Sequence, residues 1–126
     1  SLGRYLLKAL LGSENHPNIV IVDRSQEAFK ILPVEFNGLT LVRDASEIPI
    51  LEEAKIKTAD VAFMVTNDEN LNLILGQVAK EIYKVPKVIA RITDEADRKS
   101  SELFKITAIN PLEWVAQEMV SYAINK

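Results

Sequence analysis

The sequence predicts a single α/β domain built on a doubly wound, mainly parallel β-sheet. Short apolar runs alternate with segments of helical periodicity along all 126 residues, which is typical of a parallel sheet with helical crossovers. Runs such as Ile19-Val20-Ile21-Val22 are apolar at successive positions, as are strands buried on both faces. A chain of this length buries roughly two thirds of its unfolded surface, enough for one core and too little for two. We therefore expect one domain over residues 1–126.

Local signals predict each element. Strands are predicted at the apolar, often β-branched runs 19–22, 39–42, 61–65, 88–90 and 107–109. Amphipathic periodicity and helix-start residues predict helices over 4–11, 25–32, 50–55, 71–83, 94–105 and 111–126. Pro33 ends the second helix, and Asn37-Gly38 forms a turn. In helix 71–83 we expect one buried face, made by Leu71, Ile74, Leu75, Val78, Ala79 and Ile82. Together these elements predict a Rossmann-like fold.

Composition excludes several classes of function. The chain contains no cysteine, so disulfides, zinc-thiolate sites and cysteine nucleophiles are excluded, and we expect no metal site. The single histidine, His16, stands before Pro17 in a predicted loop and cannot build a histidine cluster. With 15 basic and 18 acidic side chains and no basic stripe, nucleic acid is not an expected partner. Apolar stretches reach four or five residues, short of the roughly 20 that cross a bilayer, so we expect a soluble domain.

The carboxyl ends of the predicted strands are where an open α/β sheet binds its ligand. Ser1-Leu2-Gly3-Arg4 precedes a helix, whose N-terminal amides could receive a phosphate, although a single glycine there is also common in turns. Asp23 follows the strand 19–22, about 20 residues after Gly3, the spacing at which a carboxylate accepts ribose hydroxyls. The alternative is an acid that caps the next helix with Ser25. Asp23 would repel a 2′-phosphate, but the adjoining Arg24 leaves NADP possible.

Two further predicted strand ends carry small or polar side chains suited to an adenine and its ribose. Asp44 and Ala45 follow the strand 39–42, and Thr66, Asn67 and Asp68 follow the strand 61–65. Each group could equally serve a turn, because Asp, Asn and Ser favour turns for backbone reasons. Arg91 follows the strand 88–90 and offers a planar cation to a phosphate, or alternatively an ion pair to Asp94.

The chain resembles the N-terminal nucleotide-binding domain of the TrkA/KtrA type, also called the RCK domain. The resemblance covers essentially the whole chain and rests on five stretches, 19–23, 42–46, 51–54, 59–72 and 88–92. Their most specific features are the acid after strand 19–22, the Asp-Ala step, the Thr-Asn-Asp loop and the Ile-Ala-Arg strand end. The resemblance implies a cytoplasmic regulatory subunit that binds an adenine nucleotide, ATP, ADP or NAD(H), and gates an integral membrane potassium channel or transporter. It also implies dimers that assemble into rings at the inner face of the membrane.

The resemblance also assigns roles to individual residues. Gly3 would be the third glycine of the phosphate loop, Asp23 the ribose ligand, and Asp44 with Ala45 the adenine edge. Thr66 and Asn67 would form the floor near the ribose, and Arg91 would face the phosphates. Helix 111–126 would be the crossover helix, whose apolar stripe packs on a partner subunit. The alternative for this helix is that it covers its own sheet.

The chain departs from the family pattern in two respects. The family begins with an apolar strand and two more glycines, so the resemblance implies a central strand supplied by upstream residues or by another chain. The family also often has an arginine where this chain has Ser1, which puts a preference for triphosphates in doubt, although Arg4 could substitute one turn away.

One enzymatic and one signalling alternative fit the sequence less well. A nicotinamide-dependent oxidoreductase would share the fold and Asp23, but no Tyr/Lys, Cys or His proton donor stands at a predicted strand end. A receiver-like phosphorelay module could use Asp68, Glu69 and Asp94 for a divalent cation, but Arg91-Ile92-Thr93 fits it poorly. We therefore do not expect an enzyme.

Overall fold

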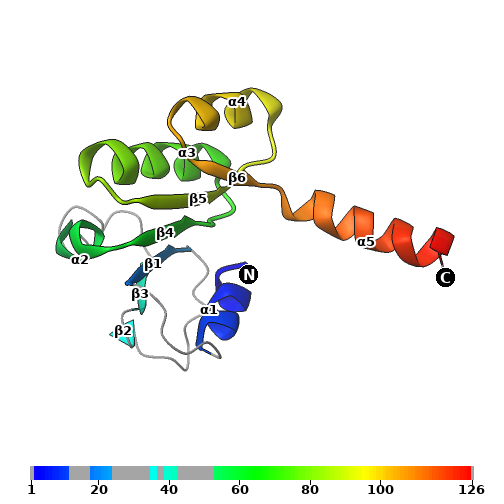
Figure 1. The fold of residues 1–126 in the computed structure, drawn as a ribbon, viewed down its shortest axis with the longest axis horizontal. Coiled ribbons are helices and arrows are strands. Elements are labelled where there is room, and N and C mark those ends of the chain that lie inside the picture. The colour runs from blue at the N-terminus through cyan, green and yellow to red at the C-terminus, as the bar shows by residue number, and fades with distance from the viewer. Residues whose placement is uncertain (1, 12–17, 24–34, 37–38, 43–52, 126) are drawn as a thin grey trace.

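The computed structural model describes residues 2–11, 18–23, 35–36, 39–42 and 53–125. In these ranges the strands form one six-stranded sheet in the order β2-β3-β1-β4-β5-β6 (Figure 1). The strands are β1 (Ile19–Val22), β2 (Glu35–Phe36), β3 (Leu39–Val42), β4 (Val61–Met64), β5 (Lys87–Arg91) and β6 (Thr107–Ile109). The helices are α1 (Leu2–Leu11), α2 (Glu53–Thr58), α3 (Glu69–Gln77), the π-helical turn η4 (Val78–Ile82), α4 (Glu95–Leu103) and α5 (Pro111–Asn125). The predicted helix 25–32 lies outside the described residues.

The sheet confirms the predicted Rossmann-like, mainly parallel architecture. Strands β3, β1, β4, β5 and β6 are parallel, with Val22 of β1 opposite both Val42 of β3 and Met64 of β4. The family pattern places a further strand at the centre of such a sheet. Here β1 and β4 pair directly over four residues, so the described sheet is continuous from β3 to β6.

The edge strand β2 was not predicted. Glu35 and Phe36 pair antiparallel with Thr40 and Leu39, whereas the sequence suggested only a turn at Asn37-Gly38, which lies outside the described residues. An Asn-Gly pair between two strand-forming segments is the strongest short-range hairpin signal. The sequence therefore contained the signal, but a two-residue strand is too short to show periodicity.

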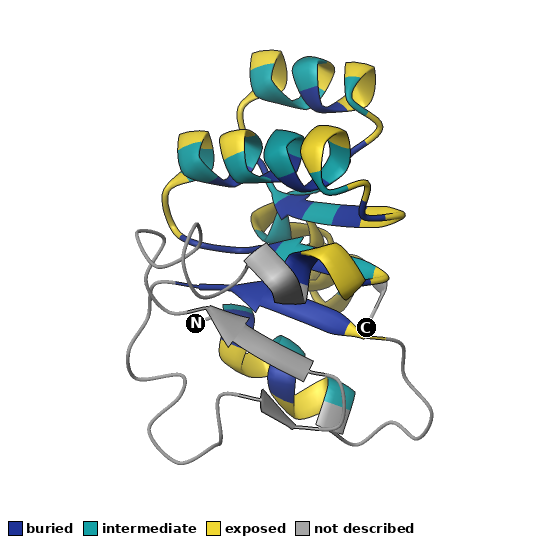
Figure 2. Cartoon of the chain, turned by 90° about the vertical axis from the view of Figure 1, so that its left-hand side faces the viewer, coloured by how far each residue is buried: buried dark blue, intermediate teal, exposed yellow. Residues whose placement is uncertain are grey.

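Apolar side chains of the central strands belong alternately to two cores, and β1 is coloured as buried along its length (Figure 2). Ile19 and Ile21 of β1 pack with Leu7 of α1, together with the partly buried Phe63 of β4. Val20 and Val22 belong to the larger core on the other face, which includes Ile56 of α2, Ala79 of η4, Met64, Val88 and Ile106. All four residues of β1 are buried, so the prediction that 19–22 is a strand buried on both faces is confirmed.

Two helix predictions need correction. Helix α2 begins at Glu53 and ends at Thr58, so it ends three residues beyond the predicted 50–55. In α3 and η4, Ile74 and Ile82 are exposed, whereas Asn72, Gly76 and Ala79 are buried. An added Cβ at Gly76 would lie 3.1 Å from the Cδ1 of Ile106, so this glycine allows close packing. The buried face was wrongly predicted because one of its members is polar and another has no side chain.

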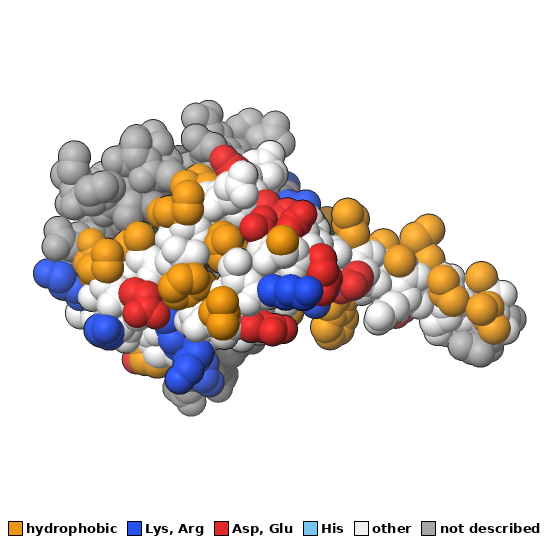
Figure 3. Space-filling model, turned by 90° about the horizontal axis from the view of Figure 1, so that it is seen from above, with side chains coloured by type: hydrophobic (Ala, Val, Ile, Leu, Met, Phe, Trp, Pro, Cys, Tyr) orange, Lys and Arg blue, Asp and Glu red, His pale blue; other side chains and the backbone are white. Residues whose placement is uncertain are grey.

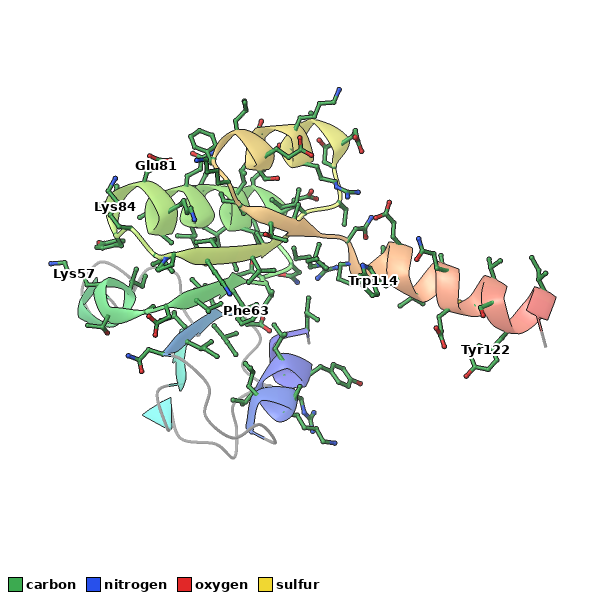
Figure 4. All side chains as sticks on the ribbon, in the orientation of Figure 1. Lys57, Phe63, Glu81, Lys84, Trp114 and Tyr122 are labelled. Atoms are coloured by element: carbon green, nitrogen blue, oxygen red, sulfur yellow. The ribbon has the colours of Figure 1, made fainter. Side chains whose placement is uncertain are left out.

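Helix α5 extends away from the sheet (Figure 1). Most of the described residues of α5 are exposed. The large apolar side chains among them are Leu112, Trp114, Val115, Met119, Val120, Tyr122 and Ile124. Trp114 lies near the start of α5, where the chain leaves β6, and Tyr122 lies near the far end of the helix (Figure 4). No helix in the described ranges combines the length and apolar character needed to span a membrane.

Candidate functional site

The carboxyl ends of the central strands meet at one edge of the sheet, called the rim below. Because β1, β4 and β5 are parallel and in register, Asp23, Thr66 and Arg91 all lie at this rim. The amide of Val65 donates to the carbonyl of Val22 at 3.0 Å and continues the pairing to the strand ends. Strand β3 ends at the same edge. The predicted site residues Ser1, Arg24, Asp44 and Ala45 lie outside the described residues.

Gly3 and Asp23 form a direct contact between the first turn of α1 and the end of β1. The backbone amide of Gly3 donates to the Oδ2 of Asp23 at 3.0 Å, and Asp23 is only 3% exposed. A Cβ at Gly3 would lie 2.8 Å from the Cβ of Asp23, so no larger residue fits without displacement. The carboxylate lies at the positive N-terminal end of α1, which stabilises its charge, and the predicted pair of glycine and acid is brought together.

Leu2 and Arg4 flank Gly3 in the first turn of α1. Leu2 is half-buried and packs on the core beneath α1, whereas Arg4 is exposed. Arg4 is therefore a solvent-exposed cation in the first turn of α1.

Thr66 is held by a buried network centred on Asn72 of α3, and both residues are 0% exposed. Asn72 Oδ1 accepts from the amide of Thr66 at 3.0 Å and contacts its hydroxyl at 2.6 Å. Asn72 Nδ2 donates to the carbonyls of Thr66 at 2.9 Å and of Arg91 at 3.0 Å. One amide side chain therefore ties the ends of β4 and β5 to each other and to α3.

The loop after β4 presents Asn67 and Asp68 to solvent, in contrast to Thr66. Asp68 caps α3, because its Oδ1 accepts from the amide of Leu71 at 3.1 Å, and its own amide donates to the hydroxyl of Thr66 at 3.1 Å. Such a cap stabilises the helix start. Asn67 is thus the residue of the predicted Thr-Asn-Asp group whose side chain is exposed without a capping role in α3.

Arg91 ends β5 and is half-buried at the rim. Its carbonyl is the acceptor of Asn72 described above, so the backbone of Arg91 is fixed relative to Thr66. The position agrees with the predicted strand end.

A second polar contact joins the loops that follow β4 and β5. Oε1 of Glu69 accepts from the amides of Thr93 at 2.5 Å and of Asp94 at 2.6 Å, and its Oε2 accepts from the Thr93 hydroxyl at 2.8 Å. Asp94 in turn caps α4 by accepting from the amide of Asp97 at 3.1 Å. Desolvation raises the pKa of the Asp97 carboxyl above its ordinary value of 3.8, and the charges of Asp94 and Glu69 raise it further.

Sequence reasoning missed Asn72 and Glu69 as residues that shape the rim. Each follows the Thr-Asn-Asp group at the start of α3, and Asn72 is a polar residue on the face that packs against the sheet. A polar side chain at a buried helical position requires hydrogen-bond partners, which was the available signal for Asn72. Among the residues that the structure describes, no group of three or more His, Asp or Glu side chains is arranged to hold a metal ion.

Comparison with known proteins identifies the family. The TrkA-N domain family matches residues 1–111 of the chain. The chain belongs to this family. The resemblance drawn from the sequence is thereby confirmed, and TrkA-N domains are Rossmann-type nucleotide-binding domains.

Relatives of this TrkA-N domain carry names from potassium uptake. The Trk system potassium uptake protein TrkA of Streptomyces coelicolor is 27% identical over 114 residues, covering 90% of this chain and 51% of that protein. A TrkA homolog of Pyrococcus abyssi is 30% identical over 100 residues, covering 79% of the chain and 44% of the homolog. TrkA homolog 2 of Methanosarcina mazei is 30% identical over 130 residues, covering 99% of the chain and 28% of the homolog. The TrkA-N domain described here thus spans about half, or less, of these relatives.

Proposed function

We propose that this TrkA-N domain binds an adenine nucleotide, ATP, ADP or NAD(H), at the rim and thereby regulates a membrane potassium channel or transporter. The observation that supports this most directly is the contact of Gly3 with Asp23. It joins a helix N-terminus, which attracts phosphate, to a carboxylate at a strand end, which accepts ribose hydroxyls. The missing Cβ of Gly3 lets Asp23 lie against the first turn of α1, because a larger residue would collide with this acid.

The rim offers a distinct group for each part of the nucleotide. Asp23 would accept the ribose hydroxyls, and the first turn of α1 from Leu2 to Arg4, preceded by Ser1, would receive phosphates. Asn67 would contact the ribose from the loop after β4. Thr66 would act indirectly, because its hydroxyl is already bonded to Asn72 and Asp68.

Further roles rest on the family resemblance. Asp44 and Ala45 would border the adenine, and Arg91 would face the phosphates. Arg24, which adjoins Asp23 in the sequence, would leave binding of a 2′-phosphate possible. Asp68 would lie beside the ribose, although the contact it makes in the structure is the capping of α3.

The potassium uptake role follows from the relatives that carry that name. A nucleotide that binds the domain more tightly in one conformation shifts the population toward that conformation. We propose that the domain acts from the cytoplasmic side on a membrane subunit, as a regulator and not as an enzyme.

Self-association is proposed to involve α5, with a second copy of this chain as the partner. An isolated helix of 15 residues is marginal in water, because most helical stability in proteins comes from packing an apolar face. Trp114, Met119 and the other large apolar side chains of α5 are exposed, and neither core formed by the described residues includes a residue of α5. Apolar side chains lie along the surface of the projecting helix (Figure 3). Packing two copies along α5 would bury both sets. It would also explain why α5 does not fold back over the sheet.

The test is a calorimetric and thermal-shift panel of ATP, ADP, AMP, NAD and NADH with the purified chain. The proposal expects at least one adenine nucleotide to release or absorb heat with a saturable isotherm and to raise the melting temperature. Guanine nucleotides at the same concentration serve as the control. If millimolar adenine nucleotides bind no better than that control, the domain does not have the proposed function.

A further inference from the structure

We infer that α4 is a mechanical link between the rim and α5, joined to the rim by Glu69 and to α5 by the ion pair of Arg98 with Glu113. This inference extends the proposed function, since it names the route by which a nucleotide would move the association helix. The link has three segments, each fixed by contacts among described residues.

The first segment connects the loop after β4 to the start of α4. Glu69 follows directly on Asn67 and Asp68, and its carboxylate accepts from Thr93 twice and from the Asp94 amide. Both oxygens of Glu69 are therefore engaged by the N-terminal end of α4. Carboxylates are stabilised at such a helix end by its amides and dipole, so a displacement of the loop after β4 is transmitted to α4.

The second segment is the first turn of α4 itself. Asp94 caps this turn through the amide of Asp97, and the amide of Arg98 donates to the carbonyl of Asp94 at 2.9 Å. The amide of Asp94 therefore donates to Glu69, and the carbonyl of Asp94 accepts from the amide of Arg98. Arg98 lies one helical turn after Asp94, and its side chain reaches Glu113 at the start of α5.

The third segment crosses from α4 to α5. NH1 of Arg98 donates to Oε1 and Oε2 of Glu113 at 3.4 Å and 3.2 Å. The start of α5 is otherwise fixed by Asn110, whose Oδ1 accepts from the amide of Leu112 at 3.0 Å. The amide of Glu113 also donates to the carbonyl of Asn110 at 3.2 Å. The larger core of the described residues contains no residue of α5, and the ion pair is a direct side-chain contact that joins α5 to α4.

The ion pair between Arg98 and Glu113 is solvent-exposed, so it can break and form again more readily than a buried contact. The side chains of Arg98 and Glu113 are 33% and 54% exposed, and ion pairs of this kind contribute little to stability. A small displacement of α4 can therefore break or re-form the pair. The direction of α5 would change while the folded domain is retained.

The direction of α5 can be measured with spin labels, because the chain has no native cysteine. One label replaces Glu81 of η4 and the other Gln117 of α5, both exposed. Labelled protein is diluted with unlabelled protein so that electron–electron distances are recorded within one chain. Without nucleotide, Glu69→Ala is expected to broaden or shift the distance distribution, as are Arg98→Ala and Glu113→Ala.

Three controls separate a link from a loss of folding. Glu69→Gln retains acceptors for the Thr93 and Asp94 amides and should keep the wild-type distribution. Arg98→Glu combined with Glu113→Arg should restore it. Glu102→Ala on α4 and Glu118→Ala on α5 remove exposed acids outside these contacts and should have no effect. An unchanged distribution in Glu69→Ala, or an equal change in the Glu102 and Glu118 variants, would overturn the inference.

A second arm adds each adenine nucleotide at saturation and records binding by calorimetry on the same samples. In the wild type, a nucleotide that binds should shift the distribution, and Arg98→Ala should abolish the shift while changing affinity by no more than about twofold, as expected for an exposed pair. A shift that survives Arg98→Ala contradicts the link. If no nucleotide binds, the proposed function fails, and the nucleotide-free variants still decide the link.

Discussion

Individual polar residues organise the rim more than its apolar residues do. Asp23 and Asn72 are each almost fully buried, and each bonds backbone amides or carbonyls of a neighbouring element. Buried polar groups require such partners, because leaving a donor or acceptor unsatisfied costs about 1–3 kcal/mol. The same side chains therefore fix the shape of the site and set how strongly a substitution is felt.

Asp23→Asn is expected to weaken nucleotide binding by about 1–3 kcal/mol, because the charged acceptor for the ribose is lost while the side-chain shape is kept. Isothermal calorimetry measures the change. The matched control is Asp60→Asn at the opposite edge of the sheet, where Oδ2 accepts from the amide of Asn18 at 3.0 Å. Equal affinities in wild type and Asp23→Asn would mean that Asp23 serves only to hold Gly3.

Asn72→Ala is expected to destabilise the fold by about 2–4 kcal/mol, because buried groups of Thr66 and Arg91 lose their partners. Urea unfolding followed by circular dichroism measures this free energy. Asn67→Ala, in the same loop and exposed, should change it by less than about 0.5 kcal/mol. A small effect at Asn72 would show that water replaces the network at no cost.

The raised pKa of Asp97 makes the stability of the folded protein depend on pH. Its pKa in the folded state lies above the ordinary 3.8, so the folded protein binds this proton more tightly than the unfolded chain. The contribution of Asp97 to stability is therefore fully present below pH 3.8 and is lost as the pH rises through the raised pKa.

Asp97→Asn should consequently raise the melting temperature near neutral pH, and the gain should disappear below pH 3.8. Carbon-detected NMR titration of the Asp97 carboxyl measures its pKa directly, and Glu69→Gln should lower that pKa toward the ordinary value. Glu102→Gln, at the far end of α4, is the control. A melting-temperature gain independent of pH would contradict the assigned cause.

At the scale of elements, strands were easier to predict than helix faces. Strands β1 and β4 are apolar at successive positions because they are buried on both sides or nearly so, and their runs are visible without tertiary information. The face of α3 was hidden because Asn72 and Gly76 pack against the sheet. Strand β2 was missed because a strand of two residues is too short to show the alternation of apolar and polar residues that predicts a strand.

The candidate site was predictable in part for the same physical reason. Parallel strands in register bring their ends together, so Asp23, Thr66 and Arg91 could be placed at one edge from the order of the strands alone. The sequence predicted that Gly3 and Asp23 lie near each other, but it did not predict the hydrogen bond between them. The contacts of Glu69 and Asn72 depend on how helices pack on the sheet, and local sequence patterns do not specify that packing.

At the scale of the whole molecule, α5 is the described helix with the largest set of exposed apolar side chains. Trp114, the only tryptophan in the sequence, is 68% exposed in the chain alone, so its fluorescence reports whether α5 is covered. Emission should shift to shorter wavelength as the protein concentration rises, in step with dimer formation in analytical ultracentrifugation.

Met119→Asp tests this packing, because a charge cannot be buried without a partner. The variant should remain monomeric with red-shifted Trp114 emission, whereas Glu118→Gln, at the adjacent exposed position, should dimerise like the wild type. A concentration-independent emission in the wild type would show that α5 does not pair two copies.

Amide chemical-shift mapping tests whether a nucleotide binds at the rim. Titration of ATP, ADP or NAD into isotopically labelled protein should shift the amides of Gly3, Arg4, Asp23 and Asn67, with little change at Asn18 and Asp60 on the opposite edge of the sheet. Shifts confined to that opposite edge or to α5, with the rim amides unmoved, would contradict the account.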